Sequence, residues 1–171
     1  MKCPRALGRI SELCTGKDLG RQVWDYTCLA PAGYRILVEV GPSGNYVLAS
    51  VLYPGHGRAG QASGVRSGTD FVIGESFVSS KHRGRGLGAA LYEALFAHAY
   101  HRMGVMRIVG ALHSTSAHRV HEKLAAKHGL KYSAAPNVEQ AKTEPGEYDE
   151  NGGAYRYGLN GLGTLLYRGI T

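Results

Sequence analysis

The sequence predicts a single mixed α/β domain, and two observations support that expectation. The first half of the chain consists of segments rich in β-forming residues that are separated by turn residues, and at Leu87 the apolar residues change to a helical spacing. The expected order is then strands, helix, strand, helix and strand. A length of 171 residues is enough for one domain with a sizeable core, and no internal repeat is visible.

The strands of the first half are expected from their composition and their turns. A short helix is expected at residues 4–13 and a short strand at 23–29. Residues 34–40 and 46–53 flank Gly41-Pro42-Ser43-Gly44, a sequence that favours a turn. We therefore expect these two segments to form a β-hairpin.

A glycine-rich stretch follows the hairpin. Five glycines fall between residues 54 and 68, with few side chains to bury. We expect a long mobile loop here, because glycine adds backbone freedom and loops of this length are often functional or disordered. Another strand is expected at residues 70–79.

A helix is expected from Leu87 to about Arg102. Leu87, Leu91 and Leu95 recur at a spacing of four residues, and small or aromatic residues between them widen the apolar face. Gly104 follows, and glycine is the residue that most often ends a helix.

The remaining elements are shorter. Residues 107–112 are expected to form a buried strand and 117–128 a second helix. The chain then becomes polar and acidic after Pro136, and 154–159 and 164–167 are expected to supply closing strands. The last strand is a candidate sheet edge for pairing with a second copy of the chain, so a homodimer is one expected assembly.

The net charge of +7 is concentrated in one part of the chain. Residues 81–131 carry nine lysines and arginines against two glutamates, so they hold the whole positive excess, together with seven of the eight histidines. A localised basic field favours an anionic small ligand, an acidic protein or nucleic acid as a partner. Lys123 and Lys127 are interpreted as parts of a solvated helix face.

Cysteine usage and hydropathy favour a cytoplasmic protein. Cys3, Cys14 and Cys28 are odd in number and are not spaced as metal ligands, so we expect reduced thiols with a structural role. No run approaches the roughly 18 apolar residues of a membrane helix. No apolar stretch follows the basic N-terminus, as one would in a signal peptide. We therefore expect no membrane partner.

The segment with the clearest chemistry runs from residue 75 to residue 91. A β-rich run leads into Arg83-Gly84-Arg85-Gly86-Leu87-Gly88, and the predicted helix follows. Glycine lets backbone approach a ligand closely, and the free N–H groups of a helix start form an anion site. The two arginines add guanidinium groups that suit phosphate. The segment therefore predicts a site for a phosphate-bearing molecule.

Two common phosphate-binding motifs fit this turn poorly. A Walker A loop needs Lys and then Ser or Thr directly after its last glycine, where this chain has Ala89 and Ala90. Gly84, Gly86 and Ala89 satisfy the dinucleotide-binding pattern, but that fold needs an acidic residue at the end of the next strand, where His113 stands. A dinucleotide site is therefore disfavoured.

In another phase the turn reads Arg83-x-x-Gly86-x-Gly88. In this form it resembles the acyl-CoA pyrophosphate signature Gln/Arg-x-x-Gly-x-Gly/Ala of the GNAT superfamily of N-acyltransferases. A later family segment has a partial counterpart, in which Ser114 stands for the family's asparagine and His121 for its tyrosine.

The resemblance is uneven along the chain. It covers residues 71–132 well and 34–53 loosely, whereas 1–33 and 136–171 match poorly. It implies one acyltransferase-like domain over residues 1–171, with a mainly antiparallel central sheet flanked by helices.

The resemblance also implies acetyl-CoA as the co-substrate and assigns its contacts. Backbone N–H groups of the turn would hold the pyrophosphate, and the main chain at residues 77–78 would line the pantetheine arm. The implied binding residues are Phe77, Val78, Arg83, Gly84, Arg85, Gly86, Leu87, Gly88, Ala89 and Ser114.

Direct attack of an amine on the thioester calls for a base and an acid. The resemblance implies Glu75 as the base, with Asp70 as its substitute. His121 is the candidate acid, because histidine donates and accepts protons near neutral pH, and a packed core histidine is the alternative there. His113 and His118 are weaker candidates.

The histidines do not indicate a metal site. His98 and His101, like His118 and His121, are spaced three residues apart, but no cysteine or acidic ligand pattern accompanies them. We expect no metal cofactor.

The sequence thus predicts a cytoplasmic acetyltransferase of the GNAT type, which moves an acetyl or other acyl group from acetyl-CoA to a primary amine of a small molecule or protein. The alternative is a catalytically inactive GNAT-like module that binds nucleic acid or an acidic protein through residues 81–131. A third interpretation combines the two, with the basic surface recruiting a nucleic-acid or ribosomal substrate for acylation.

Overall fold

The computed structural model describes residues 10, 12–105, 107–110, 112–114, 120, 123–124, 126–128, 130–133, 154–156 and 165–169. Its strands are β1 (Lys17–Gly20), β2 (Val23–Asp25), β3 (Arg35–Val40), β4 (Tyr46–Tyr53), β5 (Gly57–Ser67), β6 (Asp70–Val78), β7 (Arg107–Gly110), β8 (Leu112–Ser114), β9 (Leu130–Ser133), β10 (Ala154–Arg156) and β11 (Leu165–Gly169). An α-helix, α1 (Leu87–Met103), and two 3-10 turns, η2 (Thr27–Leu29) and η3 (Ser80–His82), accompany them.

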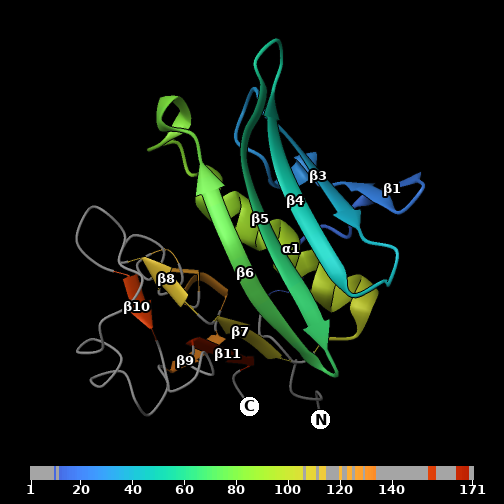
Figure 1. The fold of residues 1–171 in the computed structure, drawn as a ribbon, viewed down its shortest axis with the longest axis vertical. Coiled ribbons are helices and arrows are strands. Elements are labelled where there is room, and N and C mark those ends of the chain that lie inside the picture. The colour runs from blue at the N-terminus through green and yellow to red at the C-terminus, as the bar shows by residue number, and fades with distance from the viewer. Residues whose placement is uncertain are drawn as a thin grey trace.

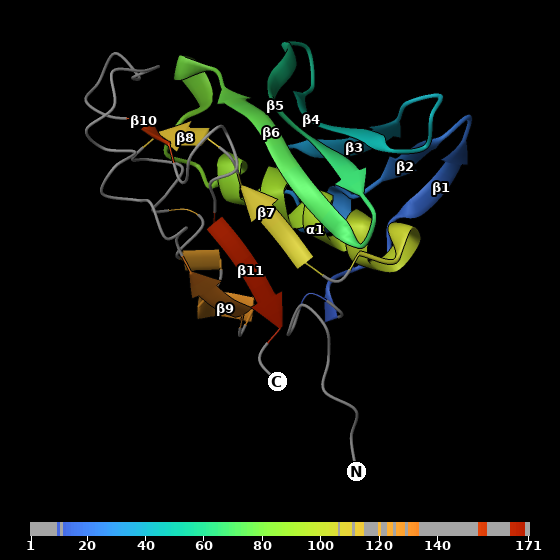
Figure 2. The ribbon, with the colours of Figure 1, turned by 60° about the horizontal axis from the view of Figure 1, so that its bottom comes forward.

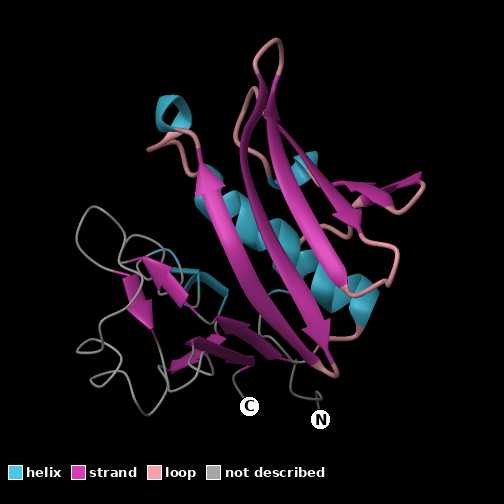
Figure 3. Cartoon of the chain, viewed as in Figure 1, coloured by secondary structure: helices cyan, strands magenta, loops and turns pink. Residues whose placement is uncertain are grey.

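The strands form one large sheet and one small one. The large sheet has nine strands in the order β1-β2-β3-β4-β5-β6-β7-β11-β9, and β8 pairs with β10 separately (Figure 1). Its neighbours are antiparallel except β6 and β7, which are parallel and joined through α1. A parallel pair needs such a crossover, and α1 crosses one face of the sheet (Figures 2 and 3). This confirms the predicted mixed, mainly antiparallel α/β domain.

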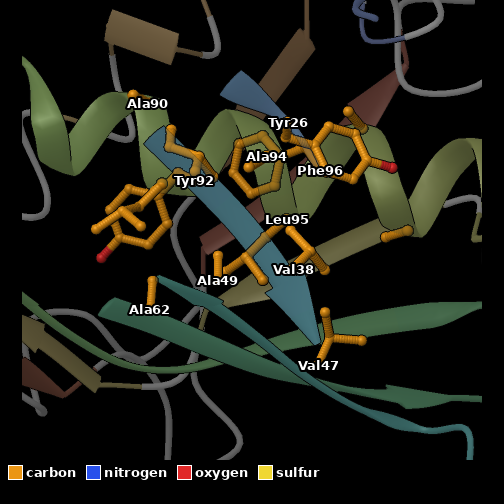
Figure 4. Packing of buried hydrophobic residues seen from close by; sticks show 14 of the residues in the cluster. Tyr26, Val38, Val47, Ala49, Ala62, Ala90, Tyr92, Ala94, Leu95 and Phe96 are labelled. Atoms are coloured by element: carbon orange, nitrogen blue, oxygen red, sulfur yellow. The ribbon is translucent and has the colours of Figure 1, made fainter. Parts of the chain in front are cut away.

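The core lies between α1 and strands β3 to β6. Val38 of β3 and Ala49 of β4 are fully buried, and Leu95 of α1 lies over them (Figure 4). α1 is buried around most of its circumference, because Leu124, from a segment whose described residues are helical, packs into the same core. This packing fixes the start of α1 beside the end of β6.

The expected mobile loop at residues 54–68 is wrong. β5 runs through this stretch and pairs antiparallel with both β4 and β6. A Cβ on Gly64 would lie 2.3 Å from the ring of Phe71, and a Cβ on Gly60 would lie 2.6 Å from the carbonyl oxygen of Phe77. Glycine therefore serves close approach at these positions in β5, not backbone freedom.

β6 changes partners along its length. Its pairing with β7 stops at Ile73, opposite Gly110. Its pairing with β5 continues to Val78, with one extra β6 residue in a bulge at Gly74 and Glu75. The second half of β6 therefore has one edge with no strand beside it in the described part of the chain.

Several predicted elements are confirmed with small changes. The hairpin is β3 and β4, the strand before the turn is β6, and α1 ends at Gly104, which is left-handed. The predicted strand at 23–29 divides into β2 and η2, and 107–112 divides between β7 and β8. Residues 120, 123–124 and 126–128 are helical, as expected for 117–128, whereas the predicted helix at 4–13 lies mostly outside the described residues.

The closing strand is not a sheet edge. β11 lies between β7 and β9 and pairs antiparallel with both. The prediction that 164–167 offers an edge to a second chain is therefore wrong. Within the described residues, the edges of the large sheet are β1 and β9.

Cys14 and Cys28 form a disulfide, with their Cα atoms 6.7 Å apart. The expectation of reduced thiols is wrong for this pair, because the fold brings η2 next to the segment that precedes β1. Cys3 lies outside the described residues. Among the described helices, none has the length and apolar character needed to cross a membrane.

Candidate functional site

The turn between β6 and α1 has the backbone that its glycines predict. Gly84 and Gly86 have φ angles of 76° and 77°, in the left-handed region that favours glycine. An added Cβ at Gly84, Gly86 or Gly88 would meet nothing within 4 Å. The backbone of this turn therefore faces open space, whereas Gly60 and Gly64 of β5 are packed against a neighbouring strand. Exposed backbone of this kind suits the binding of a ligand, and the turn is therefore called the glycine cradle.

The start of α1 presents unpaired N–H groups to this cradle. No side chain caps the helix, its first turn contains no acidic residue, and Ala90 N donates to Gly86 O at 3.1 Å. The N–H groups between these two residues have no intrahelical acceptor. Together with the positive end of the helix dipole, they favour an anion such as phosphate.

A groove of about 980 Å³ extends from the turn along the free edge of β6. This volume is near the top of the range of roughly 300–1,000 Å³ for small-molecule sites. Its walls come from the end of β6, the turn, α1 and helical residues between 120 and 127. The predicted coenzyme contacts that line it are Phe77, Val78, Arg83, Gly84, Gly86, Leu87, Gly88 and Ala89.

The two predicted arginines differ in position. Arg83 lines the groove, and its Nε donates to Val78 O at 3.1 Å, which holds the guanidinium against the end of β6. Arg85 is not a lining residue, and its Nη1 donates to the Tyr34 hydroxyl at 3.2 Å. Tyr34 also hydrogen-bonds His82 Nδ1 at 2.8 Å. Arg85 therefore ties the turn to the start of β3.

Glu75 and Asp70 lie at different places on β6. Glu75 is exposed in the bulge where β6 and β7 part. Asp70 is the first residue of β6 and lies opposite Arg107, about 20 Å along the strand from Ser76 at roughly 3.3 Å per residue. Position therefore favours Glu75 over Asp70 as a group that acts beside the groove.

A hydroxyl pair lies inside the groove. Tyr92 of α1 donates a hydrogen bond of 2.6 Å to Ser76 Oγ, and both residues line the groove. Tyr92 is 3% exposed. Burial raises the pKa of the Tyr92 phenol above its ordinary value, against the opposing effect of the bond to Ser76, so the phenol keeps its proton at neutral pH.

A buried carboxylate holds the helical wall of the groove against α1. Glu93 accepts hydrogen bonds from Lys127 Nζ at 3.0 Å and interacts with His128 Nε2 at 3.1 Å. Burial acts to raise the pKa of Glu93, but the bonds to His128 and Lys127 outweigh it and lower the pKa. Glu93 is therefore a structural anion at the groove wall.

The candidate acid His121 lies outside the described residues, as does His118, so their roles stay predictions. His113 and Ser114 belong to β8, where Ser114 pairs with Ala154, and neither side chain is described. Within the described residues no group of three potential metal ligands occurs.

Two histidines of α1 also have internal partners. His98 is buried and hydrogen-bonds Tyr26 Oη through Nδ1 at 3.0 Å. His101 contacts Leu13 O through Nε2 at 3.0 Å. Both histidines therefore attach α1 to the N-terminal part of the domain.

Sequence reasoning missed several polar residues of the groove. Tyr92 and Glu93 belong to a helix whose apolar spacing pointed only to the core, and Ser76 was one residue in a β-rich run. Lys123 and Lys127, interpreted as solvated cations, are both exposed but line the groove. These residues could have been found as polar side chains within an apolar strand or helix pattern, because a buried polar group needs a partner or a ligand.

The parted strands, the uncapped helix start and the groove have the shape and polarity that suit an elongated, phosphate-bearing molecule beside a strand edge. The sequence profile of the Acetyltransferase (GNAT) family matches residues 12–126. Because this match spans more than half of the chain, the protein belongs to the GNAT acetyltransferase family. No curated protein sequence matches the chain significantly.

Solved structures share the fold at low sequence identity. A GNAT family acetyltransferase from Elizabethkingia anophelis with acetyl-CoA bound has a TM-score of 0.54 and 14% identity, over 82% of this chain and 100% of that one. Diaminobutyrate acetyltransferase from Paenibacillus lautus, in complex with L-2,4-diaminobutyric acid and coenzyme A, has a TM-score of 0.51 and 19% identity, over 71% and 69%. A Bacillus subtilis acetyltransferase in complex with CoA has a TM-score of 0.51 and 14% identity, over 74% and 78%.

Proposed function

We propose that this protein is an acetyl-CoA-dependent N-acyltransferase that acylates a primary amine by direct attack. The observation that carries the proposal is the edge of β6 beyond Ile73, which has no strand beside it among the described residues and leads from the bulge to the glycine cradle at the start of α1. The structural relatives with bound acetyl-CoA or CoA support the donor, and the diaminobutyrate complex supports an amine acceptor.

Each end of the groove suits one part of the donor. The N–H groups at the start of α1 bind the pyrophosphate, and Arg83 and Lys123 add positive charge. The pantetheine arm is extended and carries amides, so it pairs with the free edge of β6 as an added strand would. This arrangement brings the thioester beside Ser76 and the bulge.

Glu75 is the proposed base. Its carboxylate takes a proton from the ammonium, the free amine attacks the thioester carbon, and the carbon–sulfur bond breaks with its electron pair remaining on sulfur. Glu75 is exposed, so an acceptor can reach it from solvent. Replacing Glu75 with Gln should lower kcat at least tenfold while leaving acetyl-CoA affinity unchanged.

Calorimetric titration with acetyl-CoA tests the donor site with a matched pair of variants. Gly86 and Gly104 bound the two ends of α1, have φ angles of 77° and 66°, and have open space at Cβ. Gly86→Glu should weaken acetyl-CoA binding at least about tenfold, because it puts negative charge and bulk in the cradle. Gly104→Glu carries a similar backbone strain and charge and should bind as the parent does.

Three results would count against the proposal. One is absence of acetyl-CoA binding by the parent protein, and another is equal affinity in the two glycine variants. The third is binding of a short DNA duplex without any binding of acetyl-CoA, which would favour the inactive nucleic-acid-binding alternative. Release of CoA thiol with L-2,4-diaminobutyrate, spermidine or a short peptide with a free N-terminus then tests acceptor classes.

A further inference from the structure

We propose that the Ser76 hydroxyl donates a hydrogen bond to the sulfur of coenzyme A as it leaves as a thiolate, and that Tyr92 positions and polarises that hydroxyl. The proposal rests on the proposed function, because it assigns one step of that reaction. Its basis is the 2.6 Å hydrogen bond from Tyr92 to Ser76 inside the groove.

The bulge in β6 directs Ser76 to the face that α1 covers. Ile73 faces α1 and is 4% exposed, and one extra residue follows it before the alternation resumes. Ser76 therefore returns to the α1 face, where it meets Tyr92, and Glu75 falls on the opposite face. The proposed base and the proposed sulfur contact thus flank the strand edge from two sides, as attack by an amine and departure of a thiolate require.

Among the described residues, the hydrogen bonds leave the Ser76 proton available. A serine hydroxyl has one proton to donate and two lone pairs. Since Tyr92 donates to Ser76 Oγ, the proton of Ser76 points elsewhere, and Ser76 is exposed where it lines the groove. Tyr92 is buried behind it and holds the serine oxygen in place. The exposed Ser76 hydroxyl can therefore donate to a ligand, and the buried Tyr92 hydroxyl holds it in position.

The chemistry calls for stabilisation of charge, not for complete proton transfer. The nitrogen–carbon bond forms, the carbon–sulfur bond breaks, and sulfur keeps the electron pair. A serine or tyrosine hydroxyl is a weaker acid than a thiol, so its proton stays on oxygen while the hydrogen bond stabilises the thiolate. Glu75 takes the first proton of the ammonium and later passes it to water. The attacking nitrogen loses its second proton to water as the amide forms, and the thiolate then takes a proton from water. A hydrogen bond to an ionised group is among the strong ones in proteins.

Other groups near the sulfur do not change in the variants chosen for the test. The charged and titratable residues that line the same groove are His82, Arg83, Glu93, Lys123 and Lys127. Their combined electrostatic effect on a bound thiol is the same in every variant. The contribution of Ser76 is therefore measured as a difference between variants.

The test titrates the thiol of bound coenzyme A by its thiolate absorbance in the ultraviolet, which needs no acceptor. The pKa of the bound thiol should be about one unit lower in the parent than in Ser76→Ala, the size expected for one hydrogen bond to a charged group. Tyr92→Phe should show a smaller shift in the same direction, and Ser76→Thr, which keeps a hydroxyl, should match the parent. CoA affinity measured at a pH where the thiol is protonated should be alike in all of these.

Two control variants separate the chemistry from loss of stability. Ser79→Ala removes a neighbouring hydroxyl that does not line the groove. Tyr26→Phe removes a buried phenol that bonds His98 away from the groove. Both should keep the parent's thiol pKa.

The outcomes distinguish this inference from the proposed function. Tight CoA binding with the same thiol pKa in the parent, Ser76→Ala and Tyr92→Phe overturns the inference alone. Absence of CoA binding by the folded parent overturns both. A thiol pKa that rises in Ser76→Ala and returns in Ser76→Thr supports the inference, and kcat should then fall at least tenfold in Ser76→Ala with the KM for acetyl-CoA unchanged.

Discussion

Gly60 offers the sharpest test of the link between the sheet and the groove. A Cβ at Gly60 would lie 2.6 Å from Phe77 O and 3.2 Å from Val78 Cα. Since ordinary contacts begin near 3.4 Å, Gly60→Ala must displace this part of β6 by close to 0.8 Å. Both contacts are backbone, so no side-chain rotation can relieve them. The residues displaced are those that line the groove.

The expected cost has two parts. Overpacking of this kind lowers the free energy of unfolding by about 1–3 kcal/mol, which urea denaturation measures. A misplacement approaching 1 Å in a site can reduce catalysis by roughly a hundredfold. We therefore expect Gly60→Ala to weaken acetyl-CoA binding at least about tenfold, although Gly60 is not a lining residue of the groove.

Gly64→Ala is the matched control. Its Cβ would lie 2.3 Å from the ring of Phe71, which belongs to the core under α1 and not to the groove. This variant should lose stability to a similar degree while the folded protein binds acetyl-CoA nearly as the parent does. Unchanged stability and affinity in Gly60→Ala would refute the reasoning. Equal losses of affinity in the two variants would show that β5 affects the groove only through global stability.

Three further predictions concern stability. Glu93→Gln should destabilise the fold by about 1–3 kcal/mol, because it removes the anion that pairs with Lys127 and His128. Folding lowers the pKa of Glu93, so this stabilisation is present above pH 4.5 and is lost as the pH falls through the pKa of the folded state. The difference in urea midpoint between parent and variant should therefore shrink in acid. Burial is the main reason that the pKa of His98 is lowered from 6.5 to about 4. As the pH falls, the unfolded chain therefore takes up this proton before the folded protein does, and the free energy of unfolding should fall by up to about 3 kcal/mol from pH 6.5 to pH 4. Thermal denaturation of His98→Gln should lack this part of the pH dependence. Cys28→Ser should lower the free energy of unfolding by about 2–3 kcal/mol by opening the loop closed with Cys14, and a reductant should destabilise the parent equally but leave the variant unchanged.

Local patterns predicted the elements that local chemistry specifies. The Gly41–Gly44 turn, with β-formers on both sides, gave the hairpin, because turn conformation depends on a few adjacent residues. The leucine spacing after Leu87 and the stop at Gly104 gave α1 almost to the residue. The turn at Gly84–Gly88 was predicted equally well, because left-handed backbone and an uncapped helix start depend on the conformation of a few adjacent residues.

Long-range contacts account for the errors. The glycines of β5 suggested a flexible loop. In the fold they are required because the neighbouring strand leaves no room for a Cβ, and a single sequence does not reveal that contact. The disulfide of Cys14 and Cys28, and the interior place of β11, likewise depend on which segments meet in the fold. Ser76 belongs to a strand and Tyr92 to a helix, and no local pattern links them. Only the bulge in β6 and the crossing of α1 bring their hydroxyls together.

The sequence by itself therefore determined that a left-handed glycine turn leads from a strand into an uncapped helix start, because glycine conformation and helix dipoles act over a few residues. The tertiary structure alone decided what the cradle opens into. β7 leaves β6 at Ile73, and the side chains of α1 and of the helical residues after it fill the other wall. A groove is made of the surfaces of several elements, and its shape exists only once they pack.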